Sequence, residues 1–317
     1  MMRKPTFILF VLLIAARPLL AQEPVIGSQP KSPKAPTDPN KLWVRLNLVH
    51  VPVTVTNDKN QRVTDLTYED FRVYEDNKLQ HIAYFTPKAL GGELLRIGVI
   101  FDTSNIRNQL RVEQEAAVDF LNTTVRPSKD MGFVVALGEV PQLVQDYTPD
   151  TKKLSEAIWS LRAGGAPILY DAIYYACKEK LLFFPPPEPY LPHPLIIISD
   201  DEDNYSEHSA EEAITMAQRA EVAIYAISAS RAGSPGQGRK VLQRLSEETG
   251  GQAFFPSQAN KMAATFKEIS EDLNSQYDLV YVSTNRALDG TFRTITIEPL
   301  KRGLRVRAKP GYFAPSK

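Results

Sequence analysis

Oxygen-bearing side chains follow two apolar runs of the sequence. The first run, residues 97–101, is followed by Asp102 and Ser104, and the second, residues 195–199, is followed by Asp200. Runs of this kind are typical of strands buried on both faces of a parallel sheet. Because ligands bind open α/β sheets outside the carboxyl ends of the strands, we expect both polar groups at one edge. Oxygen ligands without His or Cys suit a hard divalent cation such as Mg²⁺.

Alternating strand and helix patterns surround these two runs. Further strands are predicted over residues 131–137, 142–146, 222–227 and 253–255, the second as a hairpin partner of the first. Helices are predicted over residues 108–125, 151–161, 169–183, 210–220, 241–249 and 261–275, with Asp150 or Thr151 as the cap of the second. Residues 93–276 are therefore predicted to form an α/β domain, with a largely parallel sheet between helices.

Two β-like segments flank this domain. In residues 42–90 apolar side chains alternate from Val49 to Val55, and a hairpin turn at Asp76 and Asn77 is expected to join residues 71–75 to 80–85. Residues 277–315 alternate in the same way. Each segment is short for an independent sandwich, so we expect the two to build one β-sandwich into which the α/β domain is inserted. The alternative is two small independent sheets packed on the α/β core.

The N-terminus predicts export. Residues 1–21 combine a basic start with a short apolar run and a small residue for cleavage, which indicates a signal peptide. The alternative is an uncleaved membrane anchor, which the interruption at Arg17 and Pro18 disfavours. Residues 22–41, rich in Pro, Lys and Ser, are interpreted as a disordered linker. The expected location is secreted, periplasmic or in the cell envelope, with no membrane span after cleavage.

Charge and cysteine usage exclude several classes of function. The 37 basic and 37 acidic residues cancel, so no basic excess indicates nucleic acid or anionic lipid as a partner. The single cysteine, Cys177, excludes an internal disulfide and is interpreted as a small buried hydrophobe. The four histidines show no metal-ligand or catalytic-triad spacing.

Several separated motifs resemble the von Willebrand factor type A domain. They are residues 102–104 after the first run, Gly164-Gly165 before residues 169–173, and residues 197–203. Residues 63–76 and 309–313 are similar to flanks of the bacterial exported type of this domain first described from Acidobacteria. The resemblance implies a Rossmann-like, mostly parallel six-stranded sheet with helices on both faces, inserted in or flanked by the small β-sandwich.

The resemblance also implies a metal-ion-dependent adhesion site, and this sequence departs from its pattern. Asp102, Ser104 and Asp200 match three ligand positions. Ile106 stands where a second Ser belongs, and Pro167 stands where a Thr belongs. The site is therefore degenerate, with Mg²⁺ or another divalent cation as its implied ligand. Residues that could substitute as ligands are Asn105, Asp201 and Asp203. The alternative is that Asp102 and Asp200 cap loops and helix starts, which is the interpretation favoured for Asp171.

These observations predict an exported, non-enzymatic protein-interaction or adhesion module. Its partner would bind at the carboxyl edge of the sheet, through an acidic side chain if a metal is bound, against a rim made by Asn105, Asp201, Asp203 and Tyr205. One alternative is a metal-free structural or scaffold protein of the cell envelope. Another is a metal-dependent hydrolase with Asp102 as nucleophile. That class is disfavoured because Ser104 occupies the place of a second Asp and no Lys or His is positioned as acid or base.

Overall fold

The computed structural model describes residues 48–87, 94–104, 110–182, 193–199, 203–228 and 237–316. All of them belong to one compact unit, Trp43–Lys317. The predicted signal peptide and linker lie outside the described residues, as do Asn105, Ile106, Asp200 and Asp201. In the part that is described, no helix combines the length and apolar character needed to cross a membrane.

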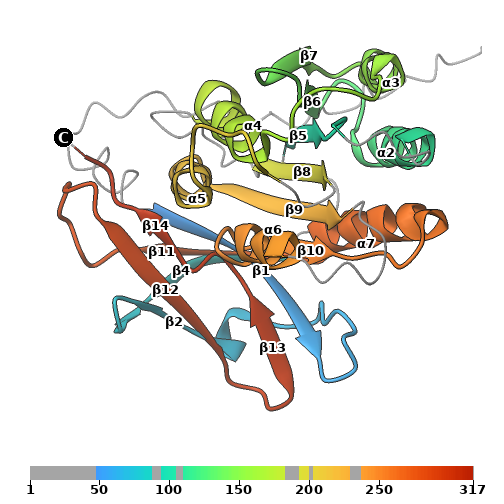
Figure 1. Ribbon diagram of the computed structural model, residues 1–317. Coiled ribbons are helices and arrows are strands. Elements are labelled where there is room, and N and C mark those ends of the chain that lie inside the picture. The colour runs from blue at the N-terminus through green and yellow to red at the C-terminus, as the bar shows by residue number, and fades with distance from the viewer. Residues whose placement is uncertain are drawn as a thin grey trace, which may run out of the picture. The chain divides into compact units, whose positions relative to one another are not determined.

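A six-stranded sheet forms the centre of the α/β part, in the order β10-β9-β8-β5-β6-β7 (Figure 1). Its strands are β5 (Arg96–Phe101), β6 (Met131–Ala136), β7 (Gln142–Thr148), β8 (His193–Ser199), β9 (Val222–Ser228) and β10 (Gln252–Phe254). All neighbouring pairs are parallel except β6 and β7, which are antiparallel. The predicted mostly parallel, Rossmann-like six-stranded sheet is confirmed.

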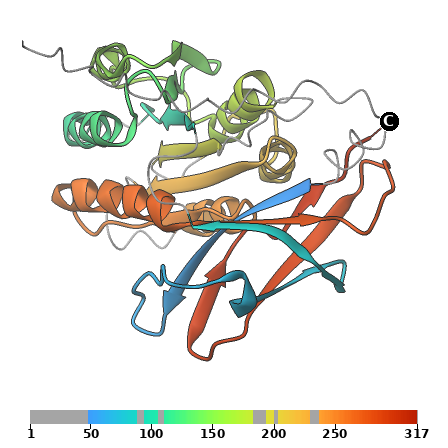
Figure 2. The same cartoon turned by 180° about the vertical axis from the view of Figure 1, so that it is seen from behind.

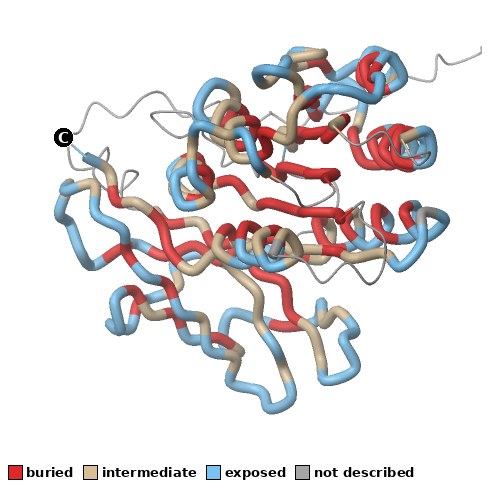
Figure 3. Tube along the Cα trace, viewed as in Figure 1, coloured by how far each residue is buried: buried red, intermediate tan, exposed pale blue. Residues whose placement is uncertain are grey.

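Helices cover both faces of this sheet. On one face lie α2 (Leu110–Thr124), α3 (Thr151–Ser160) and α7 (Met262–Ser275). On the other lie α4 (Leu169–Tyr175), α5 (Ala210–Arg219) and α6 (Gln237–Glu247). Figure 3 shows that the central strands between these layers are buried along most of their length. This explains why their sequences are continuous apolar runs and not alternating ones.

The helix predicted over residues 169–183 changes character along its length. It is α-helical to Tyr175 and continues as a π-helical turn over Ala176–Leu181. Cys177 lies in this turn with none of its surface exposed, and burial raises the pKa of its thiol. The residue therefore packs as a small hydrophobe.

Two four-stranded sheets pack face to face beside the α/β part, in the orders β13-β1-β11-β4 and β14-β12-β2-β3 (Figures 1 and 2). The N-terminal strands are β1 (Leu48–Asn57), β2 (Phe71–Glu75), β3 (Lys78–Gln80) and β4 (Ile82–Pro87). The C-terminal strands are β11 (Tyr277–Val282), β12 (Phe292–Pro299), β13 (Leu304–Arg307) and β14 (Gly311–Phe313). Each sheet mixes strands from both ends of the sequence, and both line one apolar core. Neither flanking segment has enough strands for a stable sandwich by itself, and pairing between the two segments provides them.

The hairpin after Asp76 and Asn77 differs from the prediction. The two turn residues have positive φ angles of 48° and 62°, as expected, but the hairpin joins β2 only to the short strand β3. Strand β4 crosses to the other sheet and pairs with β11. There Phe85 stacks on Tyr277, with ring centroids 5.1 Å apart, and faces Phe71 of the opposite sheet at 5.6 Å. A strand that stayed beside β2 would leave this part of the core uncovered.

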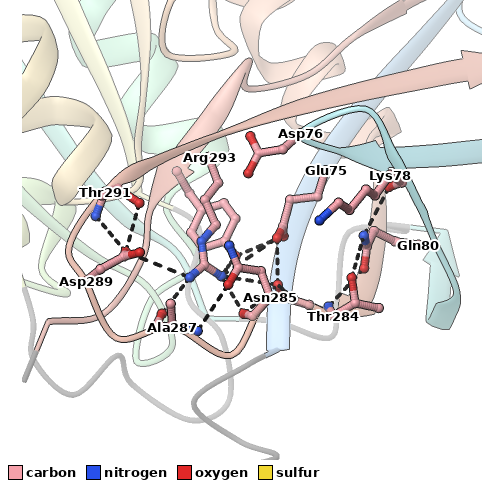
Figure 4. Close-up of polar contacts among 12 residues, drawn as sticks. Glu75, Asp76, Lys78, Gln80, Thr284, Asn285, Ala287, Asp289, Thr291 and Arg293 are labelled. Carbon is pink, nitrogen blue, oxygen red and sulfur yellow. Dashed lines mark hydrogen bonds and ion pairs between the residues drawn. The ribbon is translucent and has the colours of Figure 1, made fainter.

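A buried polar cluster, the Glu75 cluster, lies in the sandwich, and Figure 4 shows its members Glu75 and Arg293 with their polar contacts. Its members are Glu75, Tyr281, Ser283, Arg293 and Tyr312, all buried. The Glu75 carboxylate accepts hydrogen bonds from the hydroxyls of Tyr281 (2.8 Å), Tyr312 (3.0 Å) and Ser283 (2.7 Å). The Arg293 guanidinium lies 3.7 Å from the same carboxylate and donates to the carbonyl of Asn285 at 2.7 Å. The cluster therefore joins β2, β11, β12 and β14.

A second buried cluster connects the sandwich to the α/β part. Asp272, near the end of α7, accepts hydrogen bonds from Tyr225 of β9 at 2.7 Å and from Arg307 of β13 at 2.6 Å. Arg307 also donates to the carbonyl of Gly250 and to the hydroxyl of Thr54. One carboxylate thus anchors a helix, a strand of the central sheet and a strand of the sandwich.

A small cavity of about 30 Å³ lies beside this junction, lined in part by His193, Glu221 and Lys309. His193 is buried, and its Nδ1 lies 3.3 Å from the carbonyl of Ala220. Burial lowers the pKa of His193 below its usual value near 6.5, although Ala220 and Glu221 act in the opposite direction. The folded protein therefore favours the neutral imidazole.

We expect His193 to make the protein less stable in acid. Because its pKa is lower in the folded state than in the unfolded state, its contribution is complete above about pH 6.5 and is lost as the pH falls below that value. The loss should approach roughly 1.4 kcal/mol per pH unit while only the unfolded state takes up the proton. Urea unfolding between pH 7.5 and 5.0 measures it. His193→Gln should reduce this dependence, whereas the exposed control His81→Gln should retain it. Equal profiles for the two variants would contradict the assignment.

Candidate functional site

The loops at the carboxyl edge of the central sheet are tied together by hydrogen bonds. The backbone N–H of Asp102 donates to the carbonyl of Ile198 at 2.8 Å. The hydroxyl of Thr103 lies 3.0 Å from the carbonyl of Leu137 and 2.8 Å from that of Gly164. The loop after β5 is thereby held against β8, the end of β6 and the loop before α4. The two strand ends that the sequence placed at one edge, those of β5 and β8, do lie side by side.

The carboxylate of Asp102 lies almost out of contact with solvent, with 7% of the residue exposed. One oxygen accepts hydrogen bonds from the backbone N–H (2.9 Å) and the hydroxyl (2.6 Å) of Ser104. The other accepts from the hydroxyl of Ser199 at 2.7 Å. Ser199 was not predicted as a site residue. Its place at the end of a buried strand, directly before Asp200, is the signal that points to it.

Asp102 and Ser104 supply two oxygen atoms of the kind that a divalent cation binds. Neighbouring oxygens in an octahedral Mg²⁺ shell lie about 2.9 Å apart, given metal–oxygen distances of 2.0–2.1 Å. Oδ1 of Asp102 and Oγ of Ser104 are separated by 2.6 Å, less than this spacing, because the Ser104 hydroxyl donates a hydrogen bond to the carboxylate. Pro167 offers no side-chain oxygen at the position of the Thr ligand. Across the described ranges, no group of three or more His, Cys, Asp or Glu residues is placed to hold a metal.

The loop that carries Pro167 is shaped by two glycines. Gly164 and Gly165 have φ angles of 144° and 99°, which side-chain-bearing residues rarely adopt. A Cβ on Gly165 would lie 2.8 Å from the carbonyl oxygen of Leu137. The glycines therefore allow this loop to pass close to the end of β6.

Of the four residues predicted to form the rim, the structure describes only Asp203 and Tyr205. Asp203 accepts hydrogen bonds from the backbone N–H of Tyr170 (2.8 Å) and from the N–H and hydroxyl of Ser206 (3.1 and 2.8 Å). It thus caps the first turn of α4 from a neighbouring loop. Tyr205 is 69% exposed and projects from the loop that Asp203 holds.

Asp171 fixes the same loop from the helix side. Its carboxylate accepts hydrogen bonds from the N–H groups of Glu207 (3.0 Å) and His208 (2.9 Å), and it lies 2.6 Å from Nδ1 of His208. Burial alone would raise the pKa of Asp171, but these bonds hold it below its usual value. The His208 ring also stacks on Tyr174, with centroids 3.8 Å apart. Sequence spacing did not reveal this His–Asp pair, because its members are 37 positions apart.

No family model and no curated protein matches this sequence. Among solved structures, proximal thread matrix protein 1 from the mussel byssus is similar, with 16% identity and a TM-score of 0.46 over 69% of this chain. The match spans only 49% of the mussel protein, about half its length. BatB from Bacteroides thetaiotaomicron is similar over 57% of this chain and all of its own, with 15% identity and a TM-score of 0.44. The vWF domain of the pilus tip protein Mfa5 from Porphyromonas gingivalis matches 61% of this chain and 96% of its own, with 13% identity and a TM-score of 0.45. These scores are low, so the assignment of the fold rests on strand order and direction.

Proposed function

We propose that this protein is an exported, non-catalytic protein-interaction module of the von Willebrand factor type A kind. Its partner binds at the carboxyl edge of the central sheet. The observation that carries the proposal is the set of hydrogen bonds by which Thr103, Asp203 and Asp171 hold three loops at and beside that edge. A preorganised surface loses little conformational entropy when a partner binds.

Exposed apolar side chains lie on this surface. Tyr205 is 69% exposed, and Val140, in the turn between β6 and β7, is 65% exposed. Aromatic side chains supply large contact areas in protein interfaces and are enriched at their centres. The rim in this proposal comprises Asn105, Asp201, Asp203 and Tyr205, with Asp203 supporting the loop from which Tyr205 projects.

In this proposal a divalent cation adds to partner binding, which the protein surface also supports. Asp102, Ser104 and Asp200 would hold it, and it would attract an acidic side chain of the partner. Pro167 removes one ligand, so partner binding relies on the protein surface as well as on the ion.

The surroundings of Asp102 argue against catalysis by this residue. Both oxygens of its carboxylate accept hydrogen bonds from serine hydroxyls, and only 7% of the residue is exposed. A nucleophilic carboxylate needs an approach path to the reacting atom and a neighbouring acid or base.

The predicted signal peptide places the module outside the cytoplasm, in the periplasm, the envelope or the medium.

Photo-crosslinking tests this function. A photoreactive benzoylphenylalanine in place of Tyr205 should capture a defined protein from an envelope extract of the source organism. The same residue in place of Thr296, which is exposed on the sandwich, should not capture it. Capture in EDTA should fall by less than about tenfold, because the surface contacts persist, and Asp200→Ala should match the effect of EDTA. Equal capture at both positions would contradict the proposal, and so would metal-dependent hydrolysis of p-nitrophenyl phosphate.

A further inference from the structure

Cationic side chains at the two edges of the central sheet differ in how they are paired. At the amino edge, where the parallel strands begin, Arg126 pairs with Asp130 at 2.7 Å and Lys309 pairs with Glu221 at 3.5 Å. In the part of the chain that the structure describes, five cationic residues at the carboxyl edge form no ion pair with an acidic side chain: Arg111, Arg162, Arg239, Lys240 and Lys261. Their charges are therefore available to a group from outside the chain.

Of these five residues, Arg239 is the one that stacks on an aromatic ring. Its guanidinium lies 4.2 Å from the centroid of the Phe255 ring. Arg239 belongs to the first turn of α6, which packs against β9 and β10 (Figure 1). Phe255 directly follows the last residue of β10. The pair therefore stands at the carboxyl edge of the central sheet.

The stacked arrangement prepares the guanidinium for an anion. A guanidinium that lies over an aromatic ring uses its face, and the N–H groups at its edge remain available. These N–H groups form a planar fork that matches the two oxygens of a carboxylate. Arg239 is also half-buried. Because its side chain is already restricted, it loses less conformational entropy on binding than a mobile arginine does.

The overall charge of the chain narrows the class of anion. The 37 basic and 37 acidic residues cancel, so the chain lacks the basic excess typical of proteins that bind nucleic acids. Arginine and aromatic side chains are enriched in protein interfaces and among the residues that dominate binding there. The pair of Arg239 and Phe255 therefore suits an acidic segment of a protein better than a nucleic acid.

We propose that Arg239, held on Phe255, binds a carboxylate of an acidic segment of the protein partner. This inference rests on the proposed function, because it assigns the chemistry of the partner at the same edge. The interaction needs no metal ion, since the guanidinium itself supplies the positive charge. It adds an anchor beside β9 and β10 to the rim that carries Tyr205.

Binding of an acidic peptide tests the carboxylate site in the full chain. The probe is dye-labelled hexaglutamate with an amidated C-terminus, and its neutral counterpart is hexaglutamine. In fluorescence anisotropy with EDTA present, we expect hexaglutamate to bind and hexaglutamine not to bind. Raising the salt concentration from about 0.05 to 0.3 M should weaken the interaction, because salt screens charges near the surface.

Substitutions of two stacked arginines show whether binding depends on Arg239. Arg239→Gln should raise the dissociation constant of hexaglutamate by roughly fivefold or more, because it removes both the charge and the fork. Arg239→Lys should also weaken binding, since lysine keeps the charge but not the fork. The matched control is Arg219→Gln. Arg219 ends α5, lies 4.0 Å from the centroid of the Phe313 ring, and should leave the dissociation constant unchanged when replaced.

Three outcomes would overturn the carboxylate site. The first is that hexaglutamate does not bind, and the second is that Arg219→Gln and Arg239→Gln weaken its binding equally. The third is a urea midpoint that Arg239→Gln lowers further than Arg219→Gln does. Both variants lose a contact with an aromatic ring, so a larger decrease would show that Arg239 pairs with an acidic group of its own chain.

Photo-capture at position 205 separates this inference from the proposed function. Capture of a defined protein by a chain that does not bind hexaglutamate would overturn the carboxylate site alone. Binding of hexaglutamate that depends on Arg239, without capture at position 205, would support the carboxylate site and contradict the partner surface around Tyr205.

Discussion

Replacing Arg293 with methionine should destabilise the protein by about 3–5 kcal/mol. Arg293 is 2% exposed, and the carboxylate of Glu75 beside it is equally buried. Without the guanidinium, Glu75 keeps hydrogen bonds from Tyr281, Tyr312 and Ser283 but loses the buried positive charge near it. The carbonyls of Asn285 and Ala287 also lose their donor. Urea denaturation with linear extrapolation measures the loss.

A second substitution separates loss of the charge pair from loss of packing. Glu75→Gln in the Arg293→Met background removes the uncompensated charge and should recover at least about 1 kcal/mol of the loss. The matched control is Arg72→Met. Arg72 is also an arginine on a sandwich strand, but its side chain is 53% exposed and lies 3.9 Å from Glu298. Its removal should change the free energy of unfolding by no more than about 0.5 kcal/mol. Equal losses for Arg72→Met and Arg293→Met would refute the role of the Glu75 cluster.

Replacing Asp272 with alanine should cost about 3 kcal/mol or more and weaken the connection between the sandwich and the α/β part. Asp272 is 1% exposed and accepts hydrogen bonds from Tyr225 and Arg307. Its loss leaves a buried hydroxyl and a largely buried guanidinium without their shared acceptor. Because Arg307 contacts both parts, we expect unfolding of the variant to spread into two transitions.

Calorimetry and hydrogen exchange measure this effect. Amides of β13 and β1 should exchange faster in Asp272→Ala than those of β5 and β8, which lie in the centre of the six-stranded sheet. The control is Glu271→Ala, one position earlier on the same helix. The Glu271 side chain is 50% exposed and pairs with Arg62 at 3.1 Å. A single sharp transition of unchanged midpoint in Asp272→Ala would show that the junction does not depend on this carboxylate.

The predictions about the central sheet follow from patterns that depend on local sequence. The buried strands β5 and β8 are apolar at nearly every position because both of their faces are covered, and this is visible without knowing their neighbours. Asp150, one of the two predicted caps, does cap α3 by accepting a hydrogen bond from Lys152. The meeting of Asp102 with the end of β8 follows from the rule that parallel strands end at one edge.

Contacts between distant residues required the tertiary structure. The transfer of β4 to the opposite sheet depends on Phe85 filling a space between Phe71 and Tyr277. No local sequence pattern indicates that these residues meet. Glu75 and Arg293 each read as a charged residue on a strand, and only the sandwich places them 3.7 Å apart and out of water.

At the candidate site, too, local sequence predicts some features, and others depend on contacts between distant residues. Residue types and spacing predicted that Asp102 and Ser104 stand at the end of a strand and that Pro167 lacks a ligand oxygen. The folded chain was needed to show that Ser199 donates to the second oxygen of Asp102 and that Asp203 and Asp171 hold the loop that carries Tyr205. The physical reason is that types and spacing along the chain decide which chemistry a residue offers, whereas packing of distant segments decides which groups meet.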